Sequence, residues 1–199
     1  MKDIANKYKT QLMNFLNDLK SKNTRKKQIP NLLTFSRLFS PFIIIPLSLF
    51  KQFTLAGIFT ALFSITDLFD GYIARKYNLV SEFGKDLDAI TDKVFTGTII
   101  ISLSIVNRNI LIFLFLELVI AVIGINDKLK NKNPYSSYIG KVKATFLYIY
   151  LVLIFCSIYF NINLIFIKII AIITLILQLA TIVNYLTRSI KLTKQIRKF

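Results

Sequence analysis

Long apolar stretches alternate with short charged connections along most of this chain of 199 residues. A helix that crosses a bilayer needs about 20 apolar residues, and these stretches are long enough to form such helices. We expect spans near residues 31–50, 54–74, 86–106, 109–125, 144–161 and 164–187. The pattern therefore predicts an all-α, polytopic membrane protein with six transmembrane helices.

The first 28 residues follow a different pattern. Apolar side chains recur there at roughly helical spacing with many lysines between them: Ile4, Leu12, Phe15, Leu16 and Leu19. This suits an amphipathic helix on an anionic membrane surface, although a partly disordered tail fits the same composition. We expect residues 1–28 to form an amphipathic juxtamembrane helix and residues 29–199 to form one membrane domain.

The formal charge of +16 at first suggests a nucleic-acid partner. The charged residues, however, lie mainly in four blocks: residues 2–27, 75–93, 128–143 and 188–198. The other connections carry single basic residues: Lys51, Arg108 and Lys168. The positive-inside rule predicts this alternation for an even number of spans with both termini cytoplasmic. Because topology explains the charge, we expect no nucleic-acid partner.

Two groups of acids interrupt the apolar background where the second and third spans meet the cytoplasmic side. Asp67 and Asp70 are three residues apart in the first group. Asp88 and Asp92 are four residues apart in the second, and Gly84 precedes Asp88 by the same interval. Residues three or four apart are neighbours on a helix. We therefore expect the four carboxylates to converge at the ends of two adjacent helices.

Two glycines and an arginine share these helix faces. A glycine inside a helix costs about 1 kcal/mol relative to alanine, so Gly71 and Gly84 indicate the close approach of a ligand or of another helix. Arg75 lies one turn beyond Gly71 and offers a cation to an anionic ligand. The segment thus combines acidic side chains, glycines that leave room for a ligand or another helix, and a positive charge.

The composition narrows the chemistry of this acidic site. The chain has no histidine, and its single cysteine, Cys156, lies in an apolar run. Ligands that are oxygens alone favour a hard ion such as Mg²⁺ or Mn²⁺, and paired ions are typical of phosphoryl displacement. Acids at helix ends can also be caps or solvated groups, but four of them beside a membrane repel one another without cations. We therefore interpret the site as a divalent-metal site.

The segment from Asp67 to Asp92 matches the signature D-x2-D-G-x2-A-R-x8-G-x3-D-x3-D at every specified position. It resembles the CDP-alcohol phosphotransferase family of membrane enzymes, and the six-helix plan and the basic N-terminus are similar to that family as well. The resemblance implies a reaction in which an alcohol attacks a CDP-linked lipid, a new phosphodiester forms and CMP leaves. It also implies a homodimer. From the resemblance and the charge topology together, we expect a multi-pass protein of a bacterial cell membrane with a cytoplasmic active site.

The resemblance also implies roles for individual residues. The metal ligands, for two Mg²⁺ or Mn²⁺ ions, would be Asp67, Asp70, Asp88 and Asp92. The residues lining the CDP-lipid site would be Asn31, Thr34, Gly71, Arg75, Ser81 and Gly84. Asp92 would also be the catalytic general base, and a carboxylate suits this role because the chain has no histidine.

Two shorter motifs concern the acceptor alcohol. Residues 31–34 followed by Arg37, and residues 139–143, resemble the phosphatidylglycerophosphate synthase branch. If so, CDP-diacylglycerol is the donor and sn-glycerol 3-phosphate is the acceptor. Its phosphate would be bound by basic side chains: Arg37, Lys128, Lys141 and Lys143. Positive-inside topology also predicts such lysines.

One departure leaves other acceptors open. Bacterial members of that branch carry an Arg-Glu pair in the fourth span, whereas here Leu116 precedes Glu117. Ala144 and Ala89 also differ from the usual threonine and proline. The alternatives are the acceptors of a cardiolipin synthase, a phosphatidylinositol-phosphate synthase or a phosphatidylserine synthase. A non-catalytic cation-binding membrane protein is a remote alternative, because transporter acids usually lie near the midplane.

Overall fold

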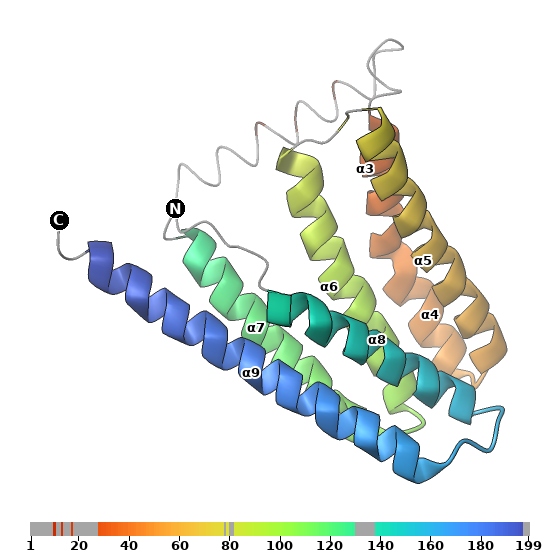
Figure 1. Ribbon diagram of the computed structural model, residues 1–199. Coiled ribbons are helices and arrows are strands. Elements are labelled where there is room, and N and C mark those ends of the chain that lie inside the picture. Colours follow the sequence, from red (N-terminus) through yellow and green to blue (C-terminus); the bar gives the residue numbers. More distant parts are fainter. Residues whose placement is uncertain are drawn as a thin grey trace. The chain divides into compact units, whose positions relative to one another are not determined.

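The structure is a computed structural model of the 199-residue chain, shown in Figure 1. It describes Thr10, Met13, Asn17 and residues 28–77, 79, 82–129 and 138–196. The predicted amphipathic helix over residues 1–28 therefore lies almost wholly outside the described residues. Within the described part the regular elements are all helical, which confirms the all-α prediction.

The helices follow the predicted order along the chain. They are α3 (Ile29–Ser36), η2 (Arg37–Phe39), α4 (Ser40–Leu49), α5 (Phe53–Lys76), α6 (Glu82–Ser104), η3 (Arg108–Ile110), α7 (Leu111–Leu129), α8 (Tyr138–Ser157) and α9 (Leu164–Ile196). Each predicted span coincides with one long helix, or, in the first case, with α3, η2 and α4 together. Helices are thus present at the places in the sequence where spans were predicted.

Five helical segments of the described chain are long and apolar enough to cross a membrane. They are Pro30–Leu49, Phe53–Ala74, Arg108–Asp127, Tyr138–Ser157 and Leu164–Ile190. Helix α6 is not among them, because its first half carries the acids and lysines of the acidic segment. The chain is therefore a multi-pass membrane protein, and the count of six spans stays a prediction.

Three helices extend beyond the predicted spans. Helix α8 begins at Tyr138 rather than near residue 144, α7 continues to Leu129, and α9 continues to Ile196. Each extension contains lysines, which the sequence analysis assigned to connections. Lysine is a good helix former, so a helix can continue past the end of its apolar part. Charge marks where a span can leave the bilayer, and not where the helix ends.

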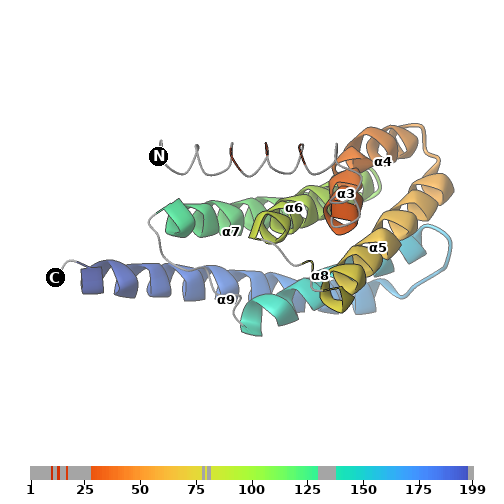
Figure 2. The ribbon, with the colours of Figure 1, turned by 90° about the horizontal axis from the view of Figure 1, so that it is seen from above.

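The chain divides into two compact units, with the boundary between Ile105 and Val106. The single membrane domain over residues 29–199 stays a prediction. In unit 1, α4 packs against both α5 and α6, and α3 packs against the same two helices (Figure 2). One buried apolar cluster contains Ile44, Ala56 and Phe95, one from each of α4, α5 and α6. This packing brings the C-terminal end of α5 close to the N-terminal end of α6.

The first predicted span is not one continuous α-helix. Pro41 lies four residues after Arg37, and a proline ring clashes with the carbonyl of the residue four positions before it. The backbone accordingly tightens into the 3₁₀ turn η2 at Arg37–Phe39, and α4 begins again with the proline in its first turn. Arg37 is the first residue of this 3₁₀ turn.

In unit 2, α9 packs along both α8 and α7. A buried polar network links the three helices: Lys143 of α8 forms an ion pair with Glu117 of α7, and Gln178 Nε2 of α9 donates to Glu117 Oε1 at 3.1 Å. The Phe113 and Tyr150 rings lie 4.8 Å apart beside it. The network therefore ties each helix of unit 2 to a shared acid.

We expect Lys143→Met to destabilise the protein by about 3–5 kcal/mol, because it leaves Glu117 buried without its cation. The double variant with Glu117→Gln should recover most of this loss, since no unpaired charge then remains. Lys141→Met is the matched control, because Lys141 lies on the same helix but is exposed. Thermal unfolding in detergent micelles measures the effect. Equal melting temperatures for Lys143→Met and Lys141→Met would contradict the prediction.

Candidate active site

Arg37 lies at the centre of the acidic segment of unit 1. Its Nη1 is 2.5 Å from Asp67 Oδ1 and 2.7 Å from Asp92 Oδ1. Its Nη2 donates to Asp88 Oδ1 at 2.8 Å and to Asp70 Oδ2 at 3.1 Å. The structure therefore brings the four predicted metal ligands together, two from α5 and two from α6, around one guanidinium from η2.

The acids and the arginine differ in their access to solvent. The Arg37 side chain is only 1% exposed, whereas the Asp67, Asp88 and Asp92 side chains are 41%, 49% and 48% exposed. Asp70 is buried at 6%. The guanidinium is thus covered, and three of the four carboxylates remain accessible to a ligand.

Three of these acids could hold a metal ion. One carboxylate oxygen from each of Asp67, Asp70 and Asp88 lies within 4.8 Å of the others. Donors that are carboxylates alone suit a hard divalent cation. Asp92 does not belong to this group of three, although it shares Arg37 with it. The donor set therefore fits a divalent cation.

A pocket of about 260 Å³ adjoins the acids. Its lining includes the predicted CDP-lipid residues Asn31, Thr34, Gly71 and Gly84, together with Asp70 and Asp88. Both glycines lie on its wall, where the missing side chains leave room for a ligand. Four of the six predicted CDP-lipid residues therefore line one cavity, and their role in binding stays a prediction.

Thr34 connects the pocket to the acids. Its Oγ1 donates to Asp70 Oδ2 at 2.8 Å and also lies 3.0 Å from Pro30 O. Asn31 Nδ2, one turn earlier, donates to Gln28 Oε1 at 2.6 Å. These contacts place α3 on the pocket side of the acidic group, where its polar side chains can meet a ligand.

Other predicted site residues are described only in part. Ser81 and the side chains of Arg75 and Lys128 lie outside the described residues. Lys141 is exposed at the start of α8, and Lys143 is buried against Glu117. Both lysines belong to unit 2, and their predicted role toward the acceptor is not tested by these contacts.

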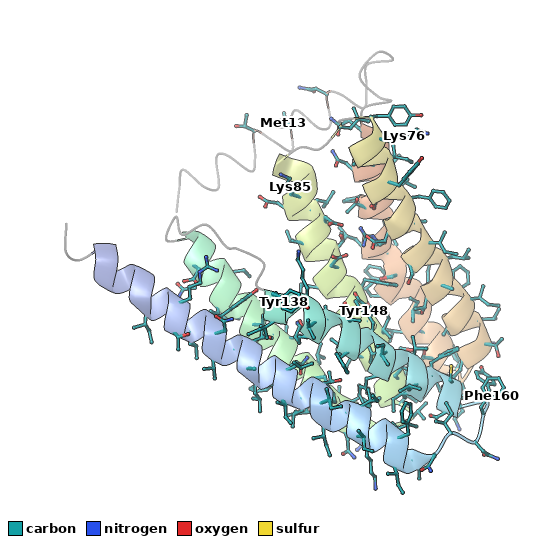
Figure 3. The ribbon with its side chains drawn as sticks, in the orientation of Figure 1. Met13, Lys76, Lys85, Tyr138, Tyr148 and Phe160 are labelled. Carbon is teal, nitrogen blue, oxygen red and sulfur yellow. The ribbon has the colours of Figure 1, made fainter. Side chains whose placement is uncertain are left out.

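Two site features were missed by the sequence analysis. The first is the contact of Arg37 with the acids, since Arg37 was assigned to the acceptor alone. The second is Lys85, which lines the pocket beside Gly84. Figure 3 shows Lys85 near the start of α6 and Lys76 at the end of α5, toward the same end of unit 1. Because Lys85 directly follows Gly84, which was predicted to line the CDP-lipid site, its position in the sequence could have indicated that it also lines the pocket.

Comparison with known proteins agrees with this geometry. A family model described as CDP-alcohol phosphatidyltransferase matches residues 27–186. The chain belongs to this family. The match includes the acids and also the pocket, so the features of unit 1 lie within the family's shared region.

Several CDP-alcohol phosphatidyltransferases resemble this chain in sequence. One from Rickettsia bellii, a CDP-diacylglycerol--glycerol-3-phosphate 3-phosphatidyltransferase, is 49% identical over 81 residues, covering 39% of this chain. The matched region spans only 44% of that relative's length. A protein of the same name from Aquifex aeolicus is 28% identical over 172 residues, covering 82% of this chain and 97% of the relative. A cardiolipin synthase (CMP-forming) / mitochondrial hydrolase fusion protein from Schizosaccharomyces pombe is 43% identical over 77 residues, covering 39% of this chain and 13% of the relative.

Proposed function

We propose that this protein transfers a phosphatidyl group from CDP-diacylglycerol to sn-glycerol 3-phosphate, giving phosphatidylglycerophosphate and CMP. The observation that carries the proposal is the convergence of four aspartates from α5 and α6 beside a pocket of about 260 Å³. Relatives named for this reaction support the choice of substrates. The acids suit the metal chemistry, and the pocket suits the nucleotide end of the lipid.

The acids would hold two divalent cations, Mg²⁺ or Mn²⁺. Asp67, Asp70 and Asp88 offer carboxylate oxygens within 4.8 Å of one another, and Asp92 completes the set. When bound, the cations would neutralise the charge on the pyrophosphate of the CDP-lipid. Gly71 and Gly84 would leave space for the pyrophosphate and the nucleotide along the pocket wall.

Asp92 would act as the general base. It would take the proton from the hydroxyl of the acceptor as that oxygen attacks the phosphatidyl phosphorus. The bond from this phosphorus to the CMP oxygen then breaks, and CMP leaves with the electron pair. Asp92 is half exposed and lies outside the group of three acids, so its carboxylate can meet a hydroxyl that arrives from solvent.

The acceptor phosphate would be bound by basic residues, for which Arg37, Lys128, Lys141 and Lys143 are the proposed ligands. We further propose that the site and both termini face the cytoplasm, as the charge alternation indicates. The family resemblance also supports a homodimer, which light scattering of the purified protein would test.

A single assay tests the proposal. Purified protein is mixed with labelled CDP-diacylglycerol, a divalent cation and one alcohol from a panel. The panel contains glycerol 3-phosphate, phosphatidylglycerol, inositol phosphate and serine. We expect CMP release that requires both the cation and glycerol 3-phosphate. Release with another alcohol alone would keep the reaction class and overturn the acceptor, and ion flux in proteoliposomes without CMP release would overturn both.

A further inference from the structure

Arg37 contacts all four aspartates of the site, and its predicted role in binding the acceptor phosphate does not explain these contacts. Its guanidinium meets one oxygen from each of four aspartates, at distances from 2.5 to 3.1 Å, while the side chain is 1% exposed. The single positive charge of the buried guanidinium therefore offsets part of the combined negative charge of the four carboxylates. Without it, these carboxylates would repel one another at this separation.

The guanidinium is held mainly through its two terminal nitrogens. Its Nε is buried and has no hydrogen-bond partner among the described residues. A buried donor without a partner is costly, so the side chain is not fully satisfied in this position. The carboxylates thus account for the described polar contacts of the group.

The same carboxylates are the proposed ligands of the divalent cations. A cation coordinated by these oxygens would lie close to the guanidinium, and two positive groups at such a distance repel strongly, even at the effective dielectric constant of a protein. Arg37 and the cations therefore compete for one set of oxygens. Arg37 lies in the 3₁₀ turn Arg37–Phe39, which interrupts the α-helix between α3 and α4. A 3₁₀ stretch within a helix often marks a functional hinge.

We propose that Arg37 is the resident counter-ion of the acidic site and is exchanged for divalent cations. Before the cations bind, its guanidinium holds the four carboxylates together. When the cations bind, it leaves those oxygens and is free to meet an anionic group of the substrates. This inference rests on the proposed metal site, and it concerns how that site is kept assembled and how it is loaded.

The exchange has two opposite consequences for a variant without the guanidinium. In Arg37→Gln the carboxylates lose their counter-ion, so the protein without cations should be less stable. The same change removes the competitor, so the affinity for cations should rise. A residue that only packs against the acids would lower stability in both states and would not tighten cation binding.

The test measures Mn²⁺ binding and thermal unfolding of the full chain in detergent micelles. We expect Arg37→Gln to bind Mn²⁺ more tightly, with a dissociation constant about tenfold lower than that of the unmodified protein. Its melting temperature should fall in EDTA and should rise more steeply on addition of Mn²⁺. Arg37→Lys, which keeps the charge without the planar fork, should lie between the two proteins in both measurements.

Arg108→Gln is the matched control, because Arg108 is an exposed arginine of η3 in unit 2. It should change neither measurement. Equal or weaker Mn²⁺ binding in Arg37→Gln would overturn the exchange and leave the metal site standing. If neither the unmodified protein nor Arg37→Gln binds Mn²⁺, the proposed metal site itself fails. Should Arg37→Gln not fold, Arg37→Lys still decides, since unchanged Mn²⁺ affinity in that variant overturns the exchange.

Discussion

Asp88→Asn should reduce CMP release by about a hundredfold or more. The substitution keeps the size of the side chain but removes one anionic ligand from the group formed with Asp67 and Asp70. In phosphoryl transfer, electrostatic stabilisation of the transition state supplies most of the rate, and losing one such contact commonly costs two to three orders of magnitude. The initial rate of CMP release at saturating CDP-diacylglycerol and acceptor measures the effect.

Two further measurements connect this loss to the metal. Mn²⁺ affinity should fall in Asp88→Asn, and a higher Mn²⁺ concentration should restore part of the rate. The ion pair of Asp88 with Arg37 is also reduced to a hydrogen bond with a neutral acceptor, so the melting temperature in EDTA is recorded alongside. A protein that remains folded but binds Mn²⁺ weakly separates a ligand role from a structural one.

The chain offers a close control in Asp86. This acid lies two positions earlier on α6, and it does not belong to the group of three acids with converging oxygens. Asp86→Asn removes the same charge from the same helix, so its rate should stay within a few fold of the unmodified rate. Full activity in Asp88→Asn, or an equal loss in both variants, would refute the metal mechanism.

The acids and the pocket could be predicted because their spacing is local. Asp67 and Asp70 are separated by one helical turn, as are Asp88 and Asp92, so each pair shares a helix face whatever the tertiary structure does. The short connection between α5 and α6 then brings the two faces to the same end. The positions of Gly71 and Gly84 follow from the same periodicity.

The position of Arg37 could not be derived in this way. Its carboxylate partners lie between 30 and 55 residues further along the chain, counting from Asp67 to Asp92. No local spacing links it to them, and it lies in a 3₁₀ turn that interrupts the first predicted span. Pro41 was a signal for this break, because proline interferes with the helix four residues before it. That signal indicates where the α-helix is interrupted, but it does not indicate which residues contact the acids.

The same limit applies to unit 2. Glu117 and Lys143 are 26 positions apart and lie on different helices. From the sequence, Lys143 was predicted to bind the acceptor phosphate, and Glu117 was noted only because Leu116 precedes it where an arginine is usual. Pairing across helices depends on how α7 and α8 rotate about their axes, which apolar periodicity determines poorly when most of each helix is apolar. Buried ion pairs in such helices are therefore found from the structure.

Asp92→Asn should lower turnover by about a hundredfold to ten-thousandfold, which is the usual contribution of a general base. An asparagine keeps the shape and can still contact Arg37, but it cannot accept the proton from the attacking hydroxyl. Asp92 lies outside the group of three converging acids, so binding of the CDP-lipid should change much less than turnover. The two quantities are measured separately, by titration with CDP-diacylglycerol and by the rate of CMP release at saturation.

The ratio of these two effects distinguishes a base from a metal ligand. Asp88→Asn should weaken cation binding together with the rate, whereas Asp92→Asn should lose rate while retaining most of its donor affinity. Asp92→Glu restores a carboxylate at a shifted position and should recover part of the turnover, without any change in donor affinity beyond that of Asp92→Asn. An equal loss of donor binding and turnover in Asp92→Asn would argue against proton transfer by this residue. It would instead leave Asp92 with a ligand role alone, like that of Asp67, Asp70 and Asp88, because a shared ligand role predicts parallel losses.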